Sequence, residues 1–302
     1  MKFILALQLV LFITTGHAQE IKWSSFDWVS YTVADRTFDK AAILIPVHLK
    51  GVERTLWMQF DTGADGTTVY GIPFKQLNIP ARYATADSST VILSASIGNY
   101  SYDSLRLWVS KGFGDSLSDK DEHPIIGTIG QDILGGKVFI LDFPKKRFCM
   151  LSTVEEIPKT MREQTSFVDL HHRNNKLFIT IQIADTSSDD FFFDTGSSIF
   201  PVATTAELWK KFTGLTGNEK QVSRLKVSSW GKEDIQLGAP ARGAMKFGNL
   251  TVENPMIYFD STGVNDFTKW PFKADGLIGN QVFYDDYTVI IDLVTNRFGI
   301  LK

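Results

Sequence analysis

Two Asp-Thr-Gly triplets are the residues of this sequence best suited to chemistry. Each ends an apolar run: Asp61-Thr62-Gly63 follows Trp57–Phe60, and Asp194-Thr195-Gly196 follows Phe191–Phe193. An aspartate at the end of a buried strand is costly unless its carboxylate is hydrogen-bonded. The threonine supplies a hydroxyl, and the glycine lets the backbone approach closely. We therefore predict a catalytic pair with supporting neighbours: Asp61 and Asp194, supported by Thr62, Gly63, Thr195, Gly196 and Ser197.

Two carboxyl groups in contact cannot both ionise easily, so they share one proton. The ionised group can take a proton from water, while the protonated group hydrogen-bonds a substrate carbonyl. This is general acid–base hydrolysis without a covalent intermediate. Ser197 follows the second triplet and could donate its hydroxyl to Asp194, whereas Ala64 cannot donate to Asp61. Asp61 is therefore expected to hold the shared proton, with a mildly acidic pH optimum.

The chain repeats itself once, which would bring the two aspartates together. Four blocks occur in the same order in both halves, at offsets of 133, 150, 149 and 150 residues. They are the two triplets with their apolar runs, Ile97–Ser101 with Phe247–Thr251, Gly127–Gly130 with Gly276–Gly279, and Asp142–Leu151 with Asp292–Leu301. Two copies are too few for a solenoid. They predict two similar lobes that face each other across a pseudo-twofold axis.

The elements that must position the triplets are mostly strands. Short β-rich runs are predicted at Ala42–Leu49, Val138–Phe143, Leu177–Ile183 and Thr288–Leu293. The best helical candidate is Thr205–Phe212, with Thr204 or Thr205 as its N-cap. A polar stretch with a proline, near Val154–Thr160, predicts the boundary between an N-terminal lobe at 19–155 and a C-terminal lobe at 156–302.

At this point the sequence resembles the pepsin-like aspartic proteases, with the retroviral proteases as single-lobe relatives. The resemblance covers roughly Ala42–Leu301. Asp194–Ser198 matches the family motif closely, while Asp61–Ala64 is more similar to the retroviral form. The hydrophobic–hydrophobic–Gly element of the family matches Leu277–Gly279, and Thr128–Gly130 departs from it by one threonine. The resemblance implies an all-β, bilobal fold with a central cleft, aspartic endopeptidase activity without metal or organic cofactor, and interlobe hydrogen bonds from Thr62 and Thr195.

The family also closes a hairpin flap over its substrate. Asp61 and Gly98 are 37 residues apart, whereas the second lobe has 54 residues in the same interval. Tyr83 is the flap candidate of the first lobe, and Trp230 lies in the longer interval of the second. Which lobe covers the cleft stays open at this stage. The absence of the family's internal disulfides and the short segment before Asp61 suggest a compact, bacterial-style enzyme without a zymogen stage.

The first 18 residues have the form of a signal peptide. Lys2 precedes the apolar run Phe3–Thr14, and Gly16 and Ala18 fit cleavage after Ala18. We expect an exported, periplasmic or secreted protein without a membrane anchor. The net charge of −3 argues against a nucleic-acid partner, and the single cysteine excludes an internal disulfide framework. The expected partner is a peptide or protein substrate, and the expected state is a monomer.

Two alternatives compete with the protease. A catalytically silent pepsin-like module could bind peptides or a protein in the same cleft. A GDSL-type serine esterase is suggested by Phe113–Asp119, Gly263–Asp266 and the Asp-x-x-His spacing of Asp169–His172. The order of these blocks is wrong for that family, and the alternation of strands and helices it needs is missing. The first two blocks also fall at equivalent places in the two repeats, so we interpret them as one turn-rich loop seen twice.

Overall fold

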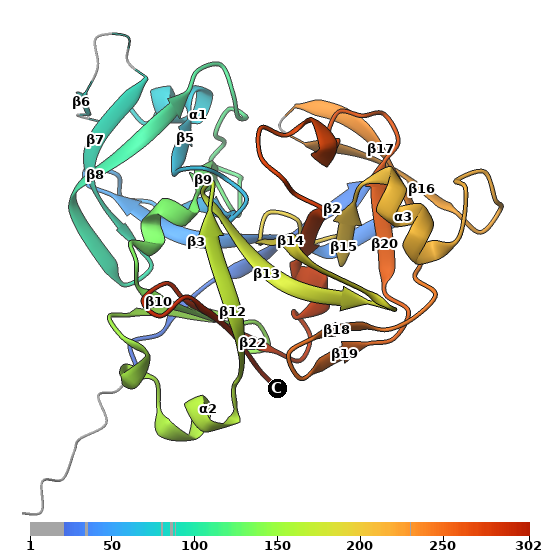
Figure 1. Cartoon of the computed structure of the whole chain (residues 1–302). Coiled ribbons are helices and arrows are strands. Elements are labelled where there is room, and N and C mark those ends of the chain that lie inside the picture. Colours follow the sequence, from blue (N-terminus) through green and yellow to red (C-terminus); the bar gives the residue numbers. More distant parts are fainter. Residues whose placement is uncertain (1–20, 34–35, 80, 85–86, 88, 230) are drawn as a thin grey trace, which may run out of the picture.

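The computed structural model describes residues 21–302, except 34–35, 80, 85–86, 88 and 230. The chain forms two β-rich lobes that lie side by side and share a central sheet (Figure 1). The predicted signal peptide, residues 1–18, lies outside the described residues. No helix among the described residues is both long and apolar enough to cross a membrane.

The first lobe contains a mixed sheet in the order β2-β3-β4-β9-β5-β8-β7-β6. Its strands are β2 (Asp27–Val33), β3 (Arg36–Leu49), β4 (Leu56–Phe60), β5 (Thr68–Tyr70), β6 (Arg82–Tyr83), β7 (Thr90–Ile97), β8 (Tyr100–Ser110) and β9 (Ile125–Ile129). Helix α1 (Gly71–Gln76) follows β5, and a 3₁₀ turn (Gln131–Leu134) follows β9. The two central strands β4 and β9 run parallel, so their carboxyl ends meet at one edge.

The second lobe repeats this arrangement in the order β13-β14-β21-β15-β20-β17-β16. Its strands are β13 (Lys176–Ile183), β14 (Thr186–Asp194), β15 (Val202–Thr204), β16 (Ser223–Ser229), β17 (Lys232–Pro240), β18 (Met245–Phe247), β19 (Leu250–Val252), β20 (Met256–Asp260) and β21 (Gly276–Gly279). Helix α3 (Ala206–Thr213) follows β15, and 3₁₀ turns lie at Phe267–Lys269 and Asn280–Val282. Strands β14 and β21 are parallel, as β4 and β9 are in the first lobe.

Strands from both lobes form the central sheet, in the order β1-β11-β10-β22-β23-β12. They are β1 (Ser24–Ser25), β10 (Val138–Asp142), β11 (Arg147–Leu151), β12 (Ser166–Arg173), β22 (Thr288–Asp292) and β23 (Arg297–Leu301). Ile140 faces Ile290, and the flanking pairs are Val138–Asp292 and Asp142–Thr288. When each residue is replaced by its repeat equivalent 150 positions away, the pair Val138–Asp292 becomes Thr288–Asp142, which is also present. The pseudo-twofold axis therefore passes between Ile140 and Ile290. The predicted repeat is confirmed.

Most of the predicted elements are present. The four predicted strands are found in β3, β10, β13 and β22, and the predicted helix is α3. The Thr205 side chain caps α3 by accepting a hydrogen bond from the Leu208 N–H at 3.2 Å. The short helices α1 and α2 (Lys159–Gln164) were not predicted, because six residues are too few to show a helical period. Helix α2 begins at Lys159, inside the stretch Val154–Thr160 that was predicted as a linker, and a 3₁₀ turn at Val154–Glu156 lies in the same stretch.

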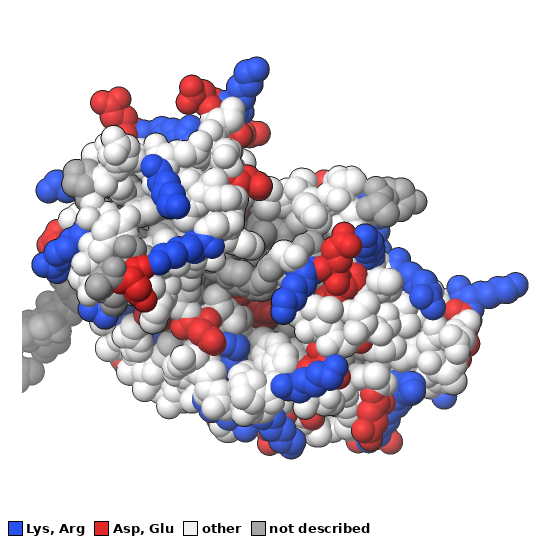
Figure 2. All heavy atoms as spheres, turned by 90° about the horizontal axis from the view of Figure 1, so that it is seen from above, with Lys and Arg blue, Asp and Glu red and all other residues white. Residues whose placement is uncertain are grey.

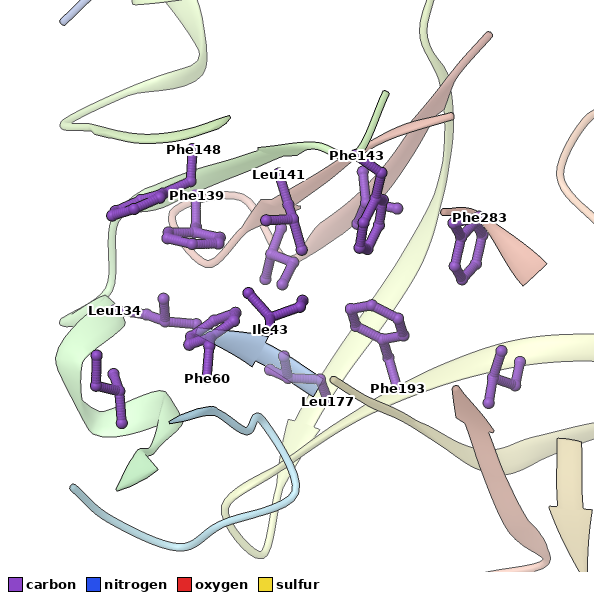
Figure 3. Packing of buried hydrophobic residues seen from close by; sticks show 14 of the residues in the cluster. Ile43, Phe60, Leu134, Phe139, Leu141, Phe143, Phe148, Leu177, Phe193 and Phe283 are labelled. Atoms are coloured by element: carbon purple, nitrogen blue, oxygen red, sulfur yellow. The ribbon is translucent and has the colours of Figure 1, made fainter. Parts of the chain in front are cut away.

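Aromatic side chains fill the core below the two triplets (Figure 3). Phe60 and Phe193 directly precede the aspartates and are both fully buried. The Phe60 ring lies 4.9 Å from that of Phe139, and the Phe193 ring lies 5.2 Å from that of Phe298. Each buried side chain of this size contributes roughly 1.5–3 kcal/mol. The residues that directly precede the two triplets are therefore anchored in the aromatic core.

The single cysteine belongs to this interior. Cys149 is buried on β11, and burial raises the pKa of its thiol to about 12. The thiol is thus uncharged and unreactive at ordinary pH, and the residue packs as a small hydrophobe.

Candidate active site

The two Asp-Thr-Gly loops begin where the central parallel strands end. The Asp61 N–H bonds the Ile129 carbonyl of β9 at 2.9 Å, and Asp194 pairs with Gly279 of β21. Gly130 and Gly279 leave room for the loops to fold back over them. A Cβ on Gly130 would lie 2.6 Å from the Gly66 backbone, and one on Gly279 would overlap the Ser197 carbonyl oxygen. This close approach explains the glycine in each hydrophobic–hydrophobic–Gly element.

Thr62 and Thr195, the interlobe threonine pair, tie the loops to each other. The Thr62 hydroxyl donates to the Phe193 carbonyl at 2.9 Å and accepts from the Thr195 N–H at 3.0 Å. The Thr195 hydroxyl mirrors this, donating to the Phe60 carbonyl at 3.0 Å and accepting from the Thr62 N–H at 2.9 Å. Both threonines are fully buried. The four bonds hold the loops in one relative position.

This pairing brings the two carboxyl groups together. Asp61 and Asp194 are joined by a side-chain hydrogen bond. The Gly63 and Ala64 N–H groups donate to Asp61 Oδ1 at 2.8 and 3.0 Å, and the Gly196 N–H donates to Asp194 Oδ1 at 2.9 Å. Each carboxyl group also lies against the glycine of the other lobe. A Cβ on Gly63 would lie 2.6 Å from Asp194 Oδ1, so a larger residue would displace the carboxylate.

The pair is electrostatically asymmetric. Burial, followed by the charge and hydrogen bond of Asp194, raises the pKa of Asp61 well above its usual range. Burial also raises the pKa of Asp194, but the hydrogen bond from Asp61, the Gly196 and Gly63 N–H groups and the Lys176 charge oppose the rise. The shared proton therefore belongs on Asp61, and Asp194 is the group that ionises first.

The direction of this asymmetry agrees with the sequence-based expectation, but its cause is different. In the described part of the chain, the Ser197 hydroxyl makes no hydrogen bond to Asp194; the Ser197 backbone N–H instead bonds the Asp194 main-chain carbonyl at 3.2 Å. The cation that favours ionised Asp194 is Lys176, which the sequence did not single out. Its ammonium group is buried and pairs with the exposed carboxylate of Asp65 in the other lobe.

A second group beside the aspartates was also missed. The Tyr70 hydroxyl lies 2.6 Å from the Thr128 hydroxyl, and the Tyr70 ring packs edge-on against Phe113 with centroids 4.8 Å apart. Burial and the Asp61 charge raise the pKa of the Tyr70 phenol. Thr128 is the threonine that departs from the family pattern, and it is buried because its hydroxyl has this partner.

Of the two flap candidates, the structure describes only Tyr83. Tyr83 lies on the short edge strand β6, which pairs with β7 over only two residues, and its side chain is exposed. Trp230 lies outside the described residues. The β16–β17 hairpin that carries it pairs over seven residues, so the longer hairpin is in the second lobe, as the spacing indicated. A Cβ on Gly231 would lie 3.9 Å from the Phe113 ring, which shows that this hairpin reaches the first lobe.

The esterase-like blocks do not form a site of their own. Phe113–Asp119 lies in the loop between β8 and β9, and Gly263–Asp266 lies in the loop between β20 and β21. These loops are pseudo-twofold equivalents, as predicted. Asp169 and His172 lie elsewhere, on β12.

Seen from above, the surface is hollowed between the lobes (Figure 2). Basic and acidic side chains are scattered over both lobes on this face and are not separated by sign. Among the described residues, no group of three or more His, Cys, Asp or Glu side chains could hold a metal ion. The groups that the structure places at the site are two carboxyl groups, backbone amides, the Lys176 ammonium and the Tyr70 phenol.

The architecture and the site define the class of protein. Two pseudo-twofold-related β lobes, a shared central sheet and one Asp-Thr-Gly loop from each lobe form the bilobal pepsin-like fold. No family model matches the sequence, and no curated protein matches it. Matching solved structures include an aspartic proteinase from Irpex lacteus, with 10% identity, a TM-score of 0.47 and coverage of 94% of this chain and 97% of that one. Basic 7S globulin from soybean matches with 9% identity, a TM-score of 0.49 and the same coverage.

Proposed function

We propose that the protein is an exported aspartic peptidase that hydrolyses peptide bonds with the Asp61–Asp194 pair. The observation that carries this proposal is the adjacent pair of carboxyl groups, each lying against the glycine of the other lobe and held in place by the interlobe threonine pair. A buried carboxyl pair with raised pKa values is costly for folding, which favours a chemical role over a structural one. Both aspartates come from one chain, which supports a monomer.

The geometry supports a definite order of proton transfers. Ionised Asp194 takes a proton from a water molecule, and the water oxygen attacks the carbonyl carbon of the substrate. Protonated Asp61 gives its proton to the carbonyl oxygen, which produces a tetrahedral diol. As the C–N bond breaks, the proton on Asp194 passes to the leaving nitrogen and a diol proton returns to Asp61. The pair then has its original protonation, and one water has been consumed.

Digestion of a peptide library between about pH 3 and 7, which runs from near the ordinary carboxyl pKa to well above it, tests this proposal. Cleavage is expected in the wild type and not in the Asp61→Asn variant. A folded wild-type protein that binds library peptides but cuts none would instead indicate the silent binding module. Labelling of a serine by a fluorophosphonate would support the esterase. Export is tested separately, because the N-terminus of the exported protein should be Gln19.

A further inference from the structure

The two ends of the cleft, which the pseudo-twofold axis should make alike, are built differently. The open end lies beside Gly63 and Asp65, on the loop after the first triplet. The closed end lies beside Gly196 and Ile199, on the loop after the second triplet. Each loop follows the aspartate of its own lobe, and the glycine of each triplet touches the aspartate of the other lobe. Each end of the cleft therefore lies next to the catalytic pair.

The open end contains a cavity of about 500 Å³. It is lined by the loop Gly63–Gly66 with Thr68, Trp108 and Asn175. Trp108 is 57% exposed and presents its indole to this space, and Asn175 comes from the tight turn between β12 and β13 in the second lobe. A volume of this size is typical of sites that hold a small ligand or part of a peptide.

The strand registers identify the residues at the closed end. In the first lobe Thr68 pairs with Thr128 and Trp108; in the second, Ala203 pairs with Leu277 and Tyr258. Tyr258 is therefore the twofold equivalent of Trp108. It is only 4% exposed, because the Phe200 ring packs on it with centroids 4.8 Å apart, and the Arg36 side chain lies close enough for its charge to act on the phenol.

Arg36 reaches Tyr258 because one hairpin is longer than its counterpart. In the second lobe the β12–β13 hairpin ends with the pair Arg173–Lys176 and a two-residue turn. In the first lobe the equivalent pair is Val29–Ala42, but β2 continues through Val33 and β3 begins at Arg36. Figure 1 shows this blue hairpin extending among the strands of the second lobe.

The far part of the β2–β3 hairpin is anchored in the second lobe by an apolar cluster. Val33 of the hairpin is buried with Leu225 and Val227 of β16, and Phe38, Ile199 and Phe200 pack against them. Ile199 and Phe200 follow the second triplet directly. The β2–β3 hairpin and β16 thus fill the space at the closed end that is equivalent to the cavity at the open end.

We infer that the cleft accepts a peptide chain on only one side of the scissile bond, so that the substrate is cut close to one of its termini. The inference rests on the proposed peptidase function and narrows the endopeptidase that the sequence predicts. An extended chain advances about 3.3 Å per residue, so a barrier beside Gly196 leaves room for only a few residues beyond the catalytic pair. A long or cyclic chain would have to displace the β2–β3 hairpin.

Four peptides with one shared cleavage sequence test this inference. They are a short peptide, the same peptide with a polar flank added at the N-terminus, at the C-terminus, and at both ends. One flank should be tolerated, and the other should lower kcat/KM by about 100-fold or more, since the chain is excluded by steric overlap. The doubly extended peptide should be cut as poorly as the worse single extension. Similar kcat/KM values for all four would overturn the inference.

Variants of the β2–β3 hairpin test whether this hairpin causes the difference in kcat/KM between the peptides. Replacing residues 30–41 by Asn-Asn imitates the turn at the open end and should restore cleavage of the doubly extended peptide. The double variant Val33→Ala/Arg36→Ala loosens the contact of the hairpin with the second lobe and carries less risk to folding. It should restore part of the cleavage of the doubly extended peptide. Tyr31→Ala is the matched control, because Tyr31 lies on the same hairpin with an exposed side chain. Unchanged discrimination in a folded hairpin variant would count against the barrier.

Calorimetric binding of the four peptides to Asp61→Asn separates this inference from the proposed function. Unequal binding, with no cleavage by the wild type, would refute the peptidase and retain the one-sided cleft. Equal binding of all four would refute the one-sided cleft alone. Failure of the wild type to cut, and of the variant to bind, any peptide would refute both.

Discussion

Substitution of Thr62 by valine removes one hydroxyl from the contact between the lobes and keeps the shape of the side chain. Two bonds are lost with that hydroxyl: the one donated to the Phe193 carbonyl and the one accepted from the Thr195 N–H. Thr62 and Thr195 are both 0% exposed, so water cannot replace the missing partner without opening the loops. Both backbone groups are left buried and unpaired.

An unpaired buried polar group costs about 1–3 kcal/mol, so the free energy of unfolding should fall by about 2–6 kcal/mol. The mirrored variant Thr195→Val should lose a similar amount, because it leaves the Phe60 carbonyl and the Thr62 N–H unpaired. Thr288→Val is the matched control. Thr288 is buried in the central sheet, and no side-chain hydrogen bond of it is found in the described structure, so its loss should stay at about 1 kcal/mol or below.

Urea unfolding, followed by tryptophan fluorescence at one pH, measures these differences. Because no bond is shared between the two hydroxyls, the double variant should lose the sum of the single losses if the loops stay together. A smaller loss would show that water enters between the loops. A Thr62→Val loss no larger than that of Thr288→Val would refute the role given to the interlobe threonine pair.

Three further predictions concern the site. Asp61→Asn should melt at the same temperature as the wild type near about pH 3.5 and at a higher temperature towards about pH 7. The pKa of Asp61 is raised in the folded state, so the wild type loses stability as the pH rises through that pKa, whereas asparagine does not titrate. An equal difference in melting temperature at every pH would contradict this. Lys176→Met should move the acidic limb of the pH–activity profile to higher pH, since its charge lowers the pKa of Asp194, and an unmoved limb would remove Lys176 from the site. Gly63→Ala should lower kcat by about 100-fold or more while the chain stays folded, because a Cβ there lies 2.6 Å from Asp194 Oδ1; wild-type kcat would contradict the close packing.

The sequence predicted the parts of the fold that are recorded in local patterns. The repeated blocks were enough to predict two lobes and the meeting of Asp61 with Asp194, because equivalent strands must lie in equivalent places. Spacing alone indicated the longer hairpin of the second lobe. The short helices α1 and α2 left no such pattern.

Contacts between distant residues were beyond the sequence. Lys176 reads as an ordinary strand residue, and its burial depends on Asp65, which is 111 positions away in the other lobe. Thr128 looked like a departure from the family pattern until its hydroxyl was found beside Tyr70. The Ser197 hydroxyl was assigned to Asp194 by adjacency, but the direction of a side chain in a loop depends on backbone angles that residue order does not reveal.

The central claim is that Asp61 and Asp194 together activate water for peptide hydrolysis. The most direct test is kcat/KM on one cleaved peptide for the wild type, Asp61→Asn and Asp194→Asn, with circular dichroism to confirm folding. Asp189→Asn is the control, because Asp189 lies exposed on β14, the same strand as Asp194. Each site variant should lose about 1,000-fold or more, and the control should stay within about twofold of the wild type. Near wild-type activity in a folded Asp61→Asn or Asp194→Asn variant would contradict the claim.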